Sequence, residues 1–378
     1  MQLAAAHEII SAMTSTKTNS GAAATLLAWF DQLQVQLPWR GSRDSYLIWL
    51  SEIMLQQTRL AVVESYYARF LERFPTIEAL AAAPLDDVLK CWEGLGYYTR
   101  ARNLHRCAQT IVNEYHGQFP TTAEALQNLP GVGRYTAAAI ASIAFNQRIA
   151  VLDGNVMRVL ARLTDLAEDI TEPRAQETLW QIAESLLPTT RPGDYNQAVM
   201  DLGRLICVPR RPDCEACPLQ QQCRAFAHHT THQRPVKKSK AERKPMNAVA
   251  AVIRDEQNRV LIAQRPTDGL LGGLWALPGG FCEPEEAMED ALQRLLHTIL
   301  RLDISVSQQM AAATQDLTHL RITLRAFACQ ITAGTPEARG VAAFAWVSEA
   351  ELDKYSFGKA DREVVNALSQ WQPRLFAE

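Results

Sequence analysis

The apolar residues of this chain follow one period up to about residue 227 and another beyond it. From Thr25 to Ala227 they recur every three or four residues, in segments separated by Pro and Gly, which is typical of amphipathic helices. Beyond a short basic stretch, branched and alternating apolar residues bounded by Asp, Asn and Gly predict strands. The sequence therefore predicts a multidomain protein, with an all-α domain followed by an α+β domain.

The predicted elements place the domain boundary between Ala227 and Met246. Helices are expected at 46–58, 66–74, 100–115, 173–187, 286–300 and 359–368, and strands at 247–254, 259–265 and 320–331. The predicted division is a flexible N-terminal extension (1–22), a helical domain (23–227), a basic linker (228–245) and an α+β domain (246–378). A length of 378 residues allows two or three domains of about 150 residues each.

The composition argues against a membrane-spanning, secreted or fibrous protein. Hydrophobic residues make up 47% of the chain, no apolar run is long enough to cross a bilayer, and residues 1–22 lack the basic start of a secretory signal. The net charge is −3, but residues 234–244 hold six basic side chains against Glu242 alone, which fits a solvated linker or a phosphate contact. We expect a monomer in a bacterial cytoplasm.

Four of the eight cysteines are close together in the sequence. Cys207, Cys214, Cys217 and Cys223 have the spacing C-x6-C-x2-C-x5-C, whereas the other four are scattered through apolar or helical segments. In a chain without export features, such a cluster is expected to bind metal rather than to form disulfides. The spacing alone allows either a zinc ion or an iron-sulfur cluster.

A glycine-rich turn between two predicted helices is the most specific local signal of the helical half. Thr121 and Glu124 are expected to form a capping box that starts a short helix, and a second helix is expected to begin near Arg134. A helix-hairpin-helix of this kind presents bare amide donors that bind a phosphate without reading the base sequence, although an ordinary αα-hairpin is the alternative. The turn residues expected to contact DNA are Leu129, Gly131, Val132 and Gly133.

Three motifs in this order resemble a known family. LPGVGR (129–134), VLDGNVMRVLAR (151–162) and the cysteine cluster are similar to the helix-hairpin-helix DNA glycosylases that carry an iron-sulfur cluster, such as the endonuclease III family. The resemblance implies a [4Fe-4S] cluster held by the loop 207–223. Four further segments resemble the adenine glycosylases of this superfamily, which remove adenine mispaired with 8-oxoguanine: LPWR (37–40), WLSEIMLQQT (49–58), GLGYYTRARNL (94–104) and YNQAVMDLG (195–203).

The resemblance implies that the catalytic residues are Glu52, Asp153, Tyr135 and Asn155. Release of adenine needs a proton on the leaving base and a negative charge near the developing sugar cation. Glu52 lies among apolar residues of a predicted helix, so burial should raise its pKa and keep it protonated. Asp153 opens a predicted helix (155–163), whose amides and dipole should keep this second carboxylate charged.

Tyr135 also bears on the type of glycosylase. Bifunctional members carry a lysine at the corresponding position, and its amine attacks the sugar to form a Schiff base. A phenol cannot form an imine, so we expect a monofunctional enzyme that uses water as its final nucleophile.

The resemblance further assigns residues to the two bases of the mispair, because the adenine must leave the base stack to be cut. The residues expected to face 8-oxoguanine are Gln57, Thr58, Leu95 and Tyr97, with Tyr97 as the wedge. The residues expected around the extruded adenine are Trp39, Arg40 and Gln197. Trp39 and Tyr97 would also fit ordinary positions in a hydrophobic core.

The α+β half resembles a Nudix domain that lacks its metal ligands. GGFCEPEEAMEDALQR (279–294) has the spacing of a Nudix box, but LLHTI (295–299) stands where a hydrolase carries acidic ligands for a divalent cation. The resemblance therefore implies a Nudix-like domain that recognises 8-oxoguanine without hydrolysing nucleotides. Its contact residues would be Thr318 and His319, although Leu317 and Thr318 differ from the Phe-Ser common in the family.

Together these predictions describe an adenine DNA glycosylase of base excision repair, whose partner is duplex DNA with an A:8-oxoguanine or A:G mispair. The alternatives are a pyrimidine-directed bifunctional glycosylase, a non-catalytic iron-sulfur protein that binds DNA or transfers electrons, and a nucleotide hydrolase. Release of free adenine distinguishes the adenine glycosylase from the first two alternatives, and the missing acidic ligands argue against the nucleotide hydrolase.

Overall fold

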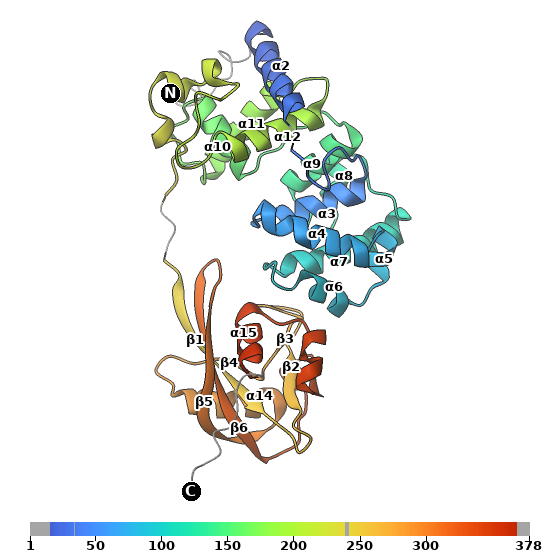
Figure 1. Cartoon of the computed structure of the whole chain (residues 1–378), viewed down its shortest axis with the longest axis vertical. Coiled ribbons are helices and arrows are strands. Elements are labelled where there is room, and N and C mark those ends of the chain that lie inside the picture. Colours follow the sequence, from blue (N-terminus) through green and yellow to red (C-terminus); the bar gives the residue numbers. More distant parts are fainter. Residues whose placement is uncertain (1–15, 34, 239–241, 369–378) are drawn as a thin grey trace. The chain divides into compact units, whose positions relative to one another are not determined.

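The computed structural model describes residues 16–33, 35–238 and 242–368, and the chain divides into two compact units (Figure 1). The first unit combines the chain up to Ala81 with Arg106–Ser239, and the second combines Ala82–His105 with the chain from Lys240 onward. The prediction of an all-α domain followed by an α+β domain is confirmed in type, but the second unit also takes a segment from within the helical half. Among the described residues, no helix is both long enough and apolar enough to cross a membrane.

The first unit is built from helices and short 3-10 turns. The predicted extension 1–22 overlaps helix α2, which begins at Thr16, and residues 1–15 lie outside the described part of the chain. The helices are α2 (Thr16–Gln32), α3 (Ser45–Leu55), α4 (Leu60–Arg73), α5 (Ile77–Ala82), α8 (Ala123–Leu126), α9 (Arg134–Phe145), α10 (Gly154–Leu163), α11 (Pro173–Leu186), α12 (Pro192–Leu205) and α13 (Arg224–Ala227). Helix α7 (Thr99–Tyr115) begins in the second unit and ends in the first. The 3-10 turns are η1 (Gln220–Gln222) and η2 (Thr231–Gln233).

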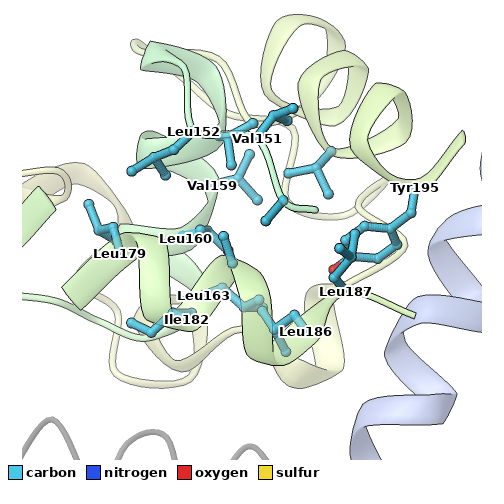
Figure 2. Close-up of a cluster of buried hydrophobic side chains, with 14 of the residues drawn as sticks. Val151, Leu152, Val159, Leu160, Leu163, Leu179, Ile182, Leu186, Leu187 and Tyr195 are labelled. Carbon is cyan, nitrogen blue, oxygen red and sulfur yellow. The ribbon is translucent and has the colours of Figure 1, made fainter. Parts of the chain in front are cut away.

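The core that supports the VLDGNVMRVLAR segment forms around α10. Every residue of α10 from Arg158 to Leu163 is buried, whereas Gly154 at its N-terminus is exposed. Figure 2 shows apolar side chains of α10 beside those of α11, of Leu187 and of Tyr195 in α12. The labelled residues are Val151, Leu152, Val159, Leu160, Leu163, Leu179, Ile182, Leu186, Leu187 and Tyr195.

The helix-hairpin-helix is present as α8, a tight turn and α9, but its predicted cap is wrong by one residue. Thr122, not Thr121, caps α8, and its hydroxyl accepts a hydrogen bond from the Ala125 amide at 3.3 Å. Because α8 begins at Ala123, the residue three positions after its N-cap is Ala125, which has no polar side chain to complete a capping box. Gly131 has a φ of +75°, a conformation that glycine adopts without strain, and Gly133 precedes α9.

The second unit contains two sheets and the helices that cover them. One sheet has the order β4-β1-β6-β5 and the other has the order β3-β2-β7. The strands are β1 (Lys244–Ile253), β2 (Val260–Gln264), β3 (Trp275–Ala276), β4 (Gly279–Phe281), β5 (Asp303–Asp316), β6 (Leu320–Ala333) and β7 (Ala343–Val347). The helices are α6 (Leu85–Trp92), α14 (Met288–Leu300) and α15 (Lys359–Leu368), with a 3-10 turn η3 (Glu349–Lys354).

Strand β1 explains why the sequence after the linker reads as a nearly continuous apolar run. It pairs in parallel with β6 and antiparallel with β4, so it lies inside its sheet. Val249, Ala251 and Ile253 pack with α14 on one face, whereas Ala248 and Ala250 pack with the core that includes α15 on the other. A strand buried on both faces needs apolar residues at every position.

Candidate active site

The described residues of the first unit enclose a cavity of about 760 Å³. It lies where α3, the start of α9, the start of α10 and α12 approach one another. Ten of the residues assigned by sequence resemblance line it: Trp39, Arg40, Glu52, Gln57, Thr58, Gly133, Tyr135, Asp153, Asn155 and Gln197. Residues from six separate stretches of sequence therefore meet at one site.

Glu52 lies on α3 and is only 6% exposed. The Tyr135 hydroxyl donates a hydrogen bond to Glu52 Oε2 at 2.7 Å and also lies 3.3 Å from Met200 Sδ. Burial raises the pKa of Glu52 to about 7, because the loss of water outweighs the opposing effect of the Tyr135 hydrogen bond. Burial also raises the pKa of Tyr135 well above its ordinary value, so the phenol keeps its proton.

Asp153 caps α10 and accepts three hydrogen bonds. Its Oδ1 accepts from the amides of Asn155 at 2.9 Å and Val156 at 2.7 Å, and its Oδ2 accepts from Asn155 Nδ2 at 2.9 Å. Asn155 Oδ1 in turn accepts from Arg158 Nη2 at 2.9 Å, so the side-chain amide of Asn155 is held at both its nitrogen and its oxygen.

The expectation that the two carboxyl groups are shifted in opposite directions is wrong. Burial raises the pKa of Asp153 as well, and the hydrogen bonds from Val156 and Asn155 offset only part of that shift. The sequence shows that Asp153 begins a helix, but it does not show how completely α12 and the neighbouring residues exclude water. A Cβ at Gly203 of α12 would lie 2.8 Å from the Cβ of Asn155, which shows how closely this helix approaches the start of α10.

Arg40 connects the loop before α3 to one face of α12. Its Nη1 donates to Gln197 Oε1 at 2.7 Å and its Nη2 donates to Asp201 Oδ2 at 2.6 Å. Trp39 is buried with its ring edge-on to Tyr67 at a centroid distance of 5.0 Å, so it has a core position and also borders the cavity. The three residues assigned to the extruded adenine thus lie at one wall.

The hairpin residues do not border this cavity, with the exception of Gly133. Leu129 and Val132 are buried, and the Val132 amide donates to the Leu129 carbonyl at 3.1 Å, which closes the turn. Gly131 lies within this turn. The hairpin ends at Gly133, which is the N-cap of α9 and so places Tyr135 in the first turn of that helix, while Gly131 and Gly133 are exposed.

The four clustered cysteines line one small cavity in the first unit. Arg162 holds this loop: its Nη1 donates to Cys207 Sγ at 3.3 Å and to the Val208 carbonyl at 2.8 Å, while Arg158 Nε donates to the Cys207 carbonyl at 2.7 Å. Within the described residues, no group of three or more His, Cys, Asp or Glu side chains has the arrangement that would hold a metal ion. The donor set nevertheless fits a cluster, because a [4Fe-4S] cluster takes four thiolates.

The remaining assigned residues belong to the second unit. Tyr97, Thr318 and His319 line a second cavity there, of about 680 Å³. Tyr97 is 47% exposed, whereas Leu95 is buried and does not border this cavity. The structure thus brings the predicted wedge next to the predicted contact residues of the Nudix-like domain.

The Nudix-box positions form an ion pair in the described structure. Arg294 of α14 donates to both carboxylate oxygens of Glu286, at 2.6 and 2.7 Å. Leu295 and Leu296 follow on the same helix, and Leu296 is completely buried in the core. These apolar side chains supply no oxygen ligands for a divalent cation.

Comparisons with known proteins agree with this geometry. Residues 50–185 match the HhH-GPD superfamily of base excision DNA repair proteins, and residues 249–367 match the NUDIX domain family. The chain is 35% identical to rat adenine DNA glycosylase, over 91% of this chain and 77% of the rat protein, and 34% identical to the human one, over 92% and 74%. The chain belongs to the adenine DNA glycosylase family.

A solved structure supports the fold of the helical part of this adenine DNA glycosylase family member. A thermostable thymine-DNA glycosylase is 30% identical and has a TM-score of 0.51, covering 57% of this chain and 99% of its own. The prediction of a helix-hairpin-helix glycosylase domain joined to a Nudix-like domain is confirmed by these matches together.

Two sets of residues at the site were missed in the sequence. Asp201 pairs with Arg40 and with Arg204, and it lies four residues after Gln197 on the same face of α12. Arg158 and Arg162, which hold the cysteine loop, have the same spacing on α10. Both sets could have been identified by helical spacing, because Asp201 lies four residues after Gln197 and Arg158 lies three residues after Asn155.

Proposed function

We propose that the protein removes adenine from DNA where it is paired with 8-oxoguanine, and with lower preference where it is paired with guanine. The observation that carries this proposal is a buried glutamate with a raised pKa, facing the same cavity as a helix-capping aspartate. The names of the relatives specify adenine and DNA. That the base opposite adenine is 8-oxoguanine is part of this proposal.

Glu52 acts as the general acid. At neutral pH a large fraction of it is protonated, and a neutral carboxylic acid gives its proton to the leaving adenine as the glycosidic bond breaks. Tyr135 donates to Oε2, which fixes the orientation of the carboxyl group and leaves Oε1 to carry the transferred proton. Water is the nucleophile that completes the hydrolysis.

Asp153 stabilises the positive charge that develops on the sugar. The amides of Asn155 and Val156 and the Asn155 side chain all donate to the ionised form of this carboxylate. Because Tyr135 occupies the position of the Schiff-base lysine, we propose a monofunctional enzyme. Borohydride reduction during the reaction should therefore trap no covalent complex with DNA.

The pH dependence of excision should reflect the protonation of Glu52. Because the acid form is active and its pKa is about 7, the single-turnover rate should fall as the pH rises from about 6 to 8 and about tenfold per unit above about pH 8. The rate should also fall at acidic pH, where Asp153 gains a proton and loses its charge. The measurement is adenine release with excess protein over a range of pH values. A rate that rises with pH through this interval would contradict the role of Glu52 as an acid.

Tyr135→Phe provides the matched variant for this profile. The tyrosine hydrogen bond lowers the pKa of Glu52, so its removal should raise that pKa and move the alkaline limb to higher pH. A limb that stays in place or moves to lower pH would show that another group controls it.

We further propose that Cys207, Cys214, Cys217 and Cys223 hold a [4Fe-4S] cluster. When bound, it would provide a rigid structural centre for the loop 207–223. The hydrogen bond from Arg162 to Cys207 Sγ is suited to a thiolate, since a guanidinium stabilises negative charge on sulfur.

Cys217→Ser should abolish the visible absorption of the cluster and most of the bound iron. The matched control is Cys282→Ser, because Cys282 lies in the second unit and outside the cysteine loop. Absorption and iron content are measured on both purified proteins. Full iron content in Cys217→Ser, or no iron in the wild type, would contradict the assignment.

The direct test of the proposed function is release of free base from defined duplexes. The wild type should release adenine from an A:8-oxoguanine duplex and, more slowly, from an A:G duplex. It should release no thymine or cytosine from control duplexes of the same sequence in which one of these bases replaces the adenine. DNA binding without release of any base would instead favour a non-catalytic iron-sulfur protein.

A further inference from the structure

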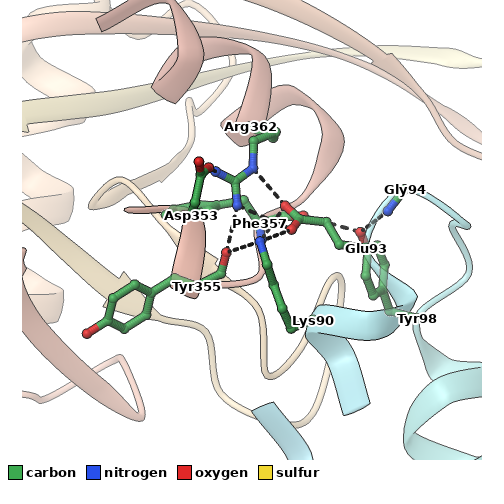
Figure 3. Close-up of polar contacts among 8 residues, drawn as sticks. All are labelled: Lys90, Glu93, Gly94, Tyr98, Asp353, Tyr355, Phe357 and Arg362. Carbon is green, nitrogen blue, oxygen red and sulfur yellow. Dashed lines mark hydrogen bonds and ion pairs between the residues drawn. The ribbon is translucent and has the colours of Figure 1, made fainter. Parts of the chain in front are cut away.

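A network of ion pairs joins two distant stretches of sequence inside the second unit (Figure 3). Glu93, at the end of α6, accepts hydrogen bonds from Arg362 Nε at 2.7 Å and Nη2 at 3.2 Å, from Lys90 Nζ at 2.6 Å and from the Phe357 amide at 3.2 Å. The two sequence segments involved are 90–98 and 353–362. The Glu93 carboxylate is therefore the centre of the contact between them.

This network is built more firmly than an exposed ion pair. The Glu93 and Arg362 side chains are only 16% and 17% exposed. Arg362 also donates to the Tyr355 carbonyl at 2.7 Å and lies over the Phe357 ring at 4.7 Å. Burial raises the pKa of Glu93, but the hydrogen bonds from Arg362 and Lys90 outweigh burial and hold this pKa below its ordinary value.

A second contact joins the same two segments a few residues farther along. The Tyr98 hydroxyl donates to the Phe357 carbonyl at 3.2 Å and accepts from the Gly94 amide at 3.2 Å. Figure 3 shows Glu93, Gly94 and Tyr98 on one side and Phe357 and Arg362 on the other. The turn from Glu93 to Tyr98 is thus held at both of its ends.

Tyr97 lies inside this turn in a conformation that needs support. Its φ is +50°, in the left-handed region that a bulky residue rarely adopts. The carbonyl of Gly96 accepts from Trp92 Nε1 at 3.0 Å and from Arg100 Nη2 at 3.1 Å, which fixes the backbone directly before it. The ring remains 47% exposed and borders the same cavity as Thr318 and His319.

We propose that Glu93 and Arg362 are positioning residues for recognition of the base opposite adenine. Their ion pair fixes the turn 93–98 against the segment 353–362, so that Tyr97 is presented next to Thr318 and His319 in one preformed arrangement. The inference rests on the proposed function, because it gives these three residues the damaged base as their ligand. It adds Glu93 and Arg362, which border the same cavity, as the pair that holds the turn in place.

The first test compares Glu93→Gln and Arg362→Met for binding to two duplexes. Each carries a non-hydrolysable adenine analogue, opposite 8-oxoguanine in one and opposite guanine in the other. Both single variants should reduce the preference for 8-oxoguanine about tenfold, and the double variant should reduce it no further, since the two residues act as a unit. Arg362→Lys, which keeps the charge but not the two-pronged hydrogen bond, should be intermediate.

Glu93→Gln also distinguishes positioning from a direct contact of Arg362 with DNA. If Arg362 only attracted phosphate, removal of the neighbouring negative charge would leave the preference unchanged and would not weaken binding. The control is Arg259→Met, which removes an exposed ion pair with Asp255 in the same unit and should leave the preference unchanged. If Glu93→Gln and Arg362→Met lose the same affinity for both duplexes, the network has only a structural role and the proposal is wrong.

A second measurement needs neither DNA nor activity. In the full-length protein, amide hydrogen exchange at Gly94 and Leu95 should become about tenfold faster in Arg362→Met, because the turn loses one of its two anchors. Unchanged exchange would overturn the proposal, and so would faster exchange with an unchanged base preference. A wild type that releases no adenine would reject the proposed function, while the exchange result would still decide whether the ion pair fixes the turn.

Discussion

Glu52→Gln is expected to slow adenine release about a thousandfold while duplex binding stays within about threefold of the wild type. Glutamine keeps the size of the side chain and can still accept the hydrogen bond from Tyr135, but it has no acidic proton to give to the base. The measurement is single-turnover excision with excess protein, together with a binding assay on the same A:8-oxoguanine duplex.

Glu72→Gln is the matched control for this variant. Glu72 is an exposed glutamate of α4, outside the cavity, and its replacement should leave the rate within about twofold of the wild type. Near-normal excision by Glu52→Gln would show that the buried carboxyl group is not the proton donor.

Asp153→Asn should slow excision about a hundredfold, which is the second-largest effect we expect. Asparagine caps a helix about as well as aspartate, so α10 should keep its start while the negative charge facing the sugar is lost. The measurement is again single-turnover release, accompanied by thermal unfolding to verify that the folded state is retained.

A second capping aspartate in the same unit separates loss of charge from loss of the cap. Asp44 caps α3 and accepts from the amides of Tyr46 at 2.8 Å and Leu47 at 3.4 Å, but it does not line the cavity. Asp44→Asn should therefore leave the rate nearly unchanged. If both variants slow excision equally, the effect comes from the helix starts rather than from charge at the reacting sugar.

Local patterns predicted the parts of the site that depend on nearby sequence. The apolar residues around Glu52 correctly indicated a buried carboxyl group with a raised pKa, and the position of Asp153 before a helix correctly indicated a cap. Helices α7, α11 and α15 and strands β1, β2 and β6 also lie where periodicity places them, to within a few residues. In each case the signal lies within a few turns of helix or one strand.

Features that depend on distant packing could not be predicted. Arg40 and Asp201 are 161 residues apart, and only the folded chain brings them together. Strand β5 was missed because it pairs along a sheet edge, with β6 as its partner, and carries many exposed Ser and Gln residues without clear apolar alternation. The direction of the pKa shift of Asp153 was missed for the same reason, since several elements together exclude water from it.

Because Ala82–His105 belongs to the second unit, the chain cannot be divided into its two units by one cut. A single cut near residue 240 would leave that segment on the amino-terminal fragment and its packing partners on the other. Leu89, which approaches Gly273, and Glu93, which pairs with Arg362, would then lose their neighbours. Neither fragment would be a self-sufficient module, so dissecting the protein at its linker would damage the part meant to be isolated.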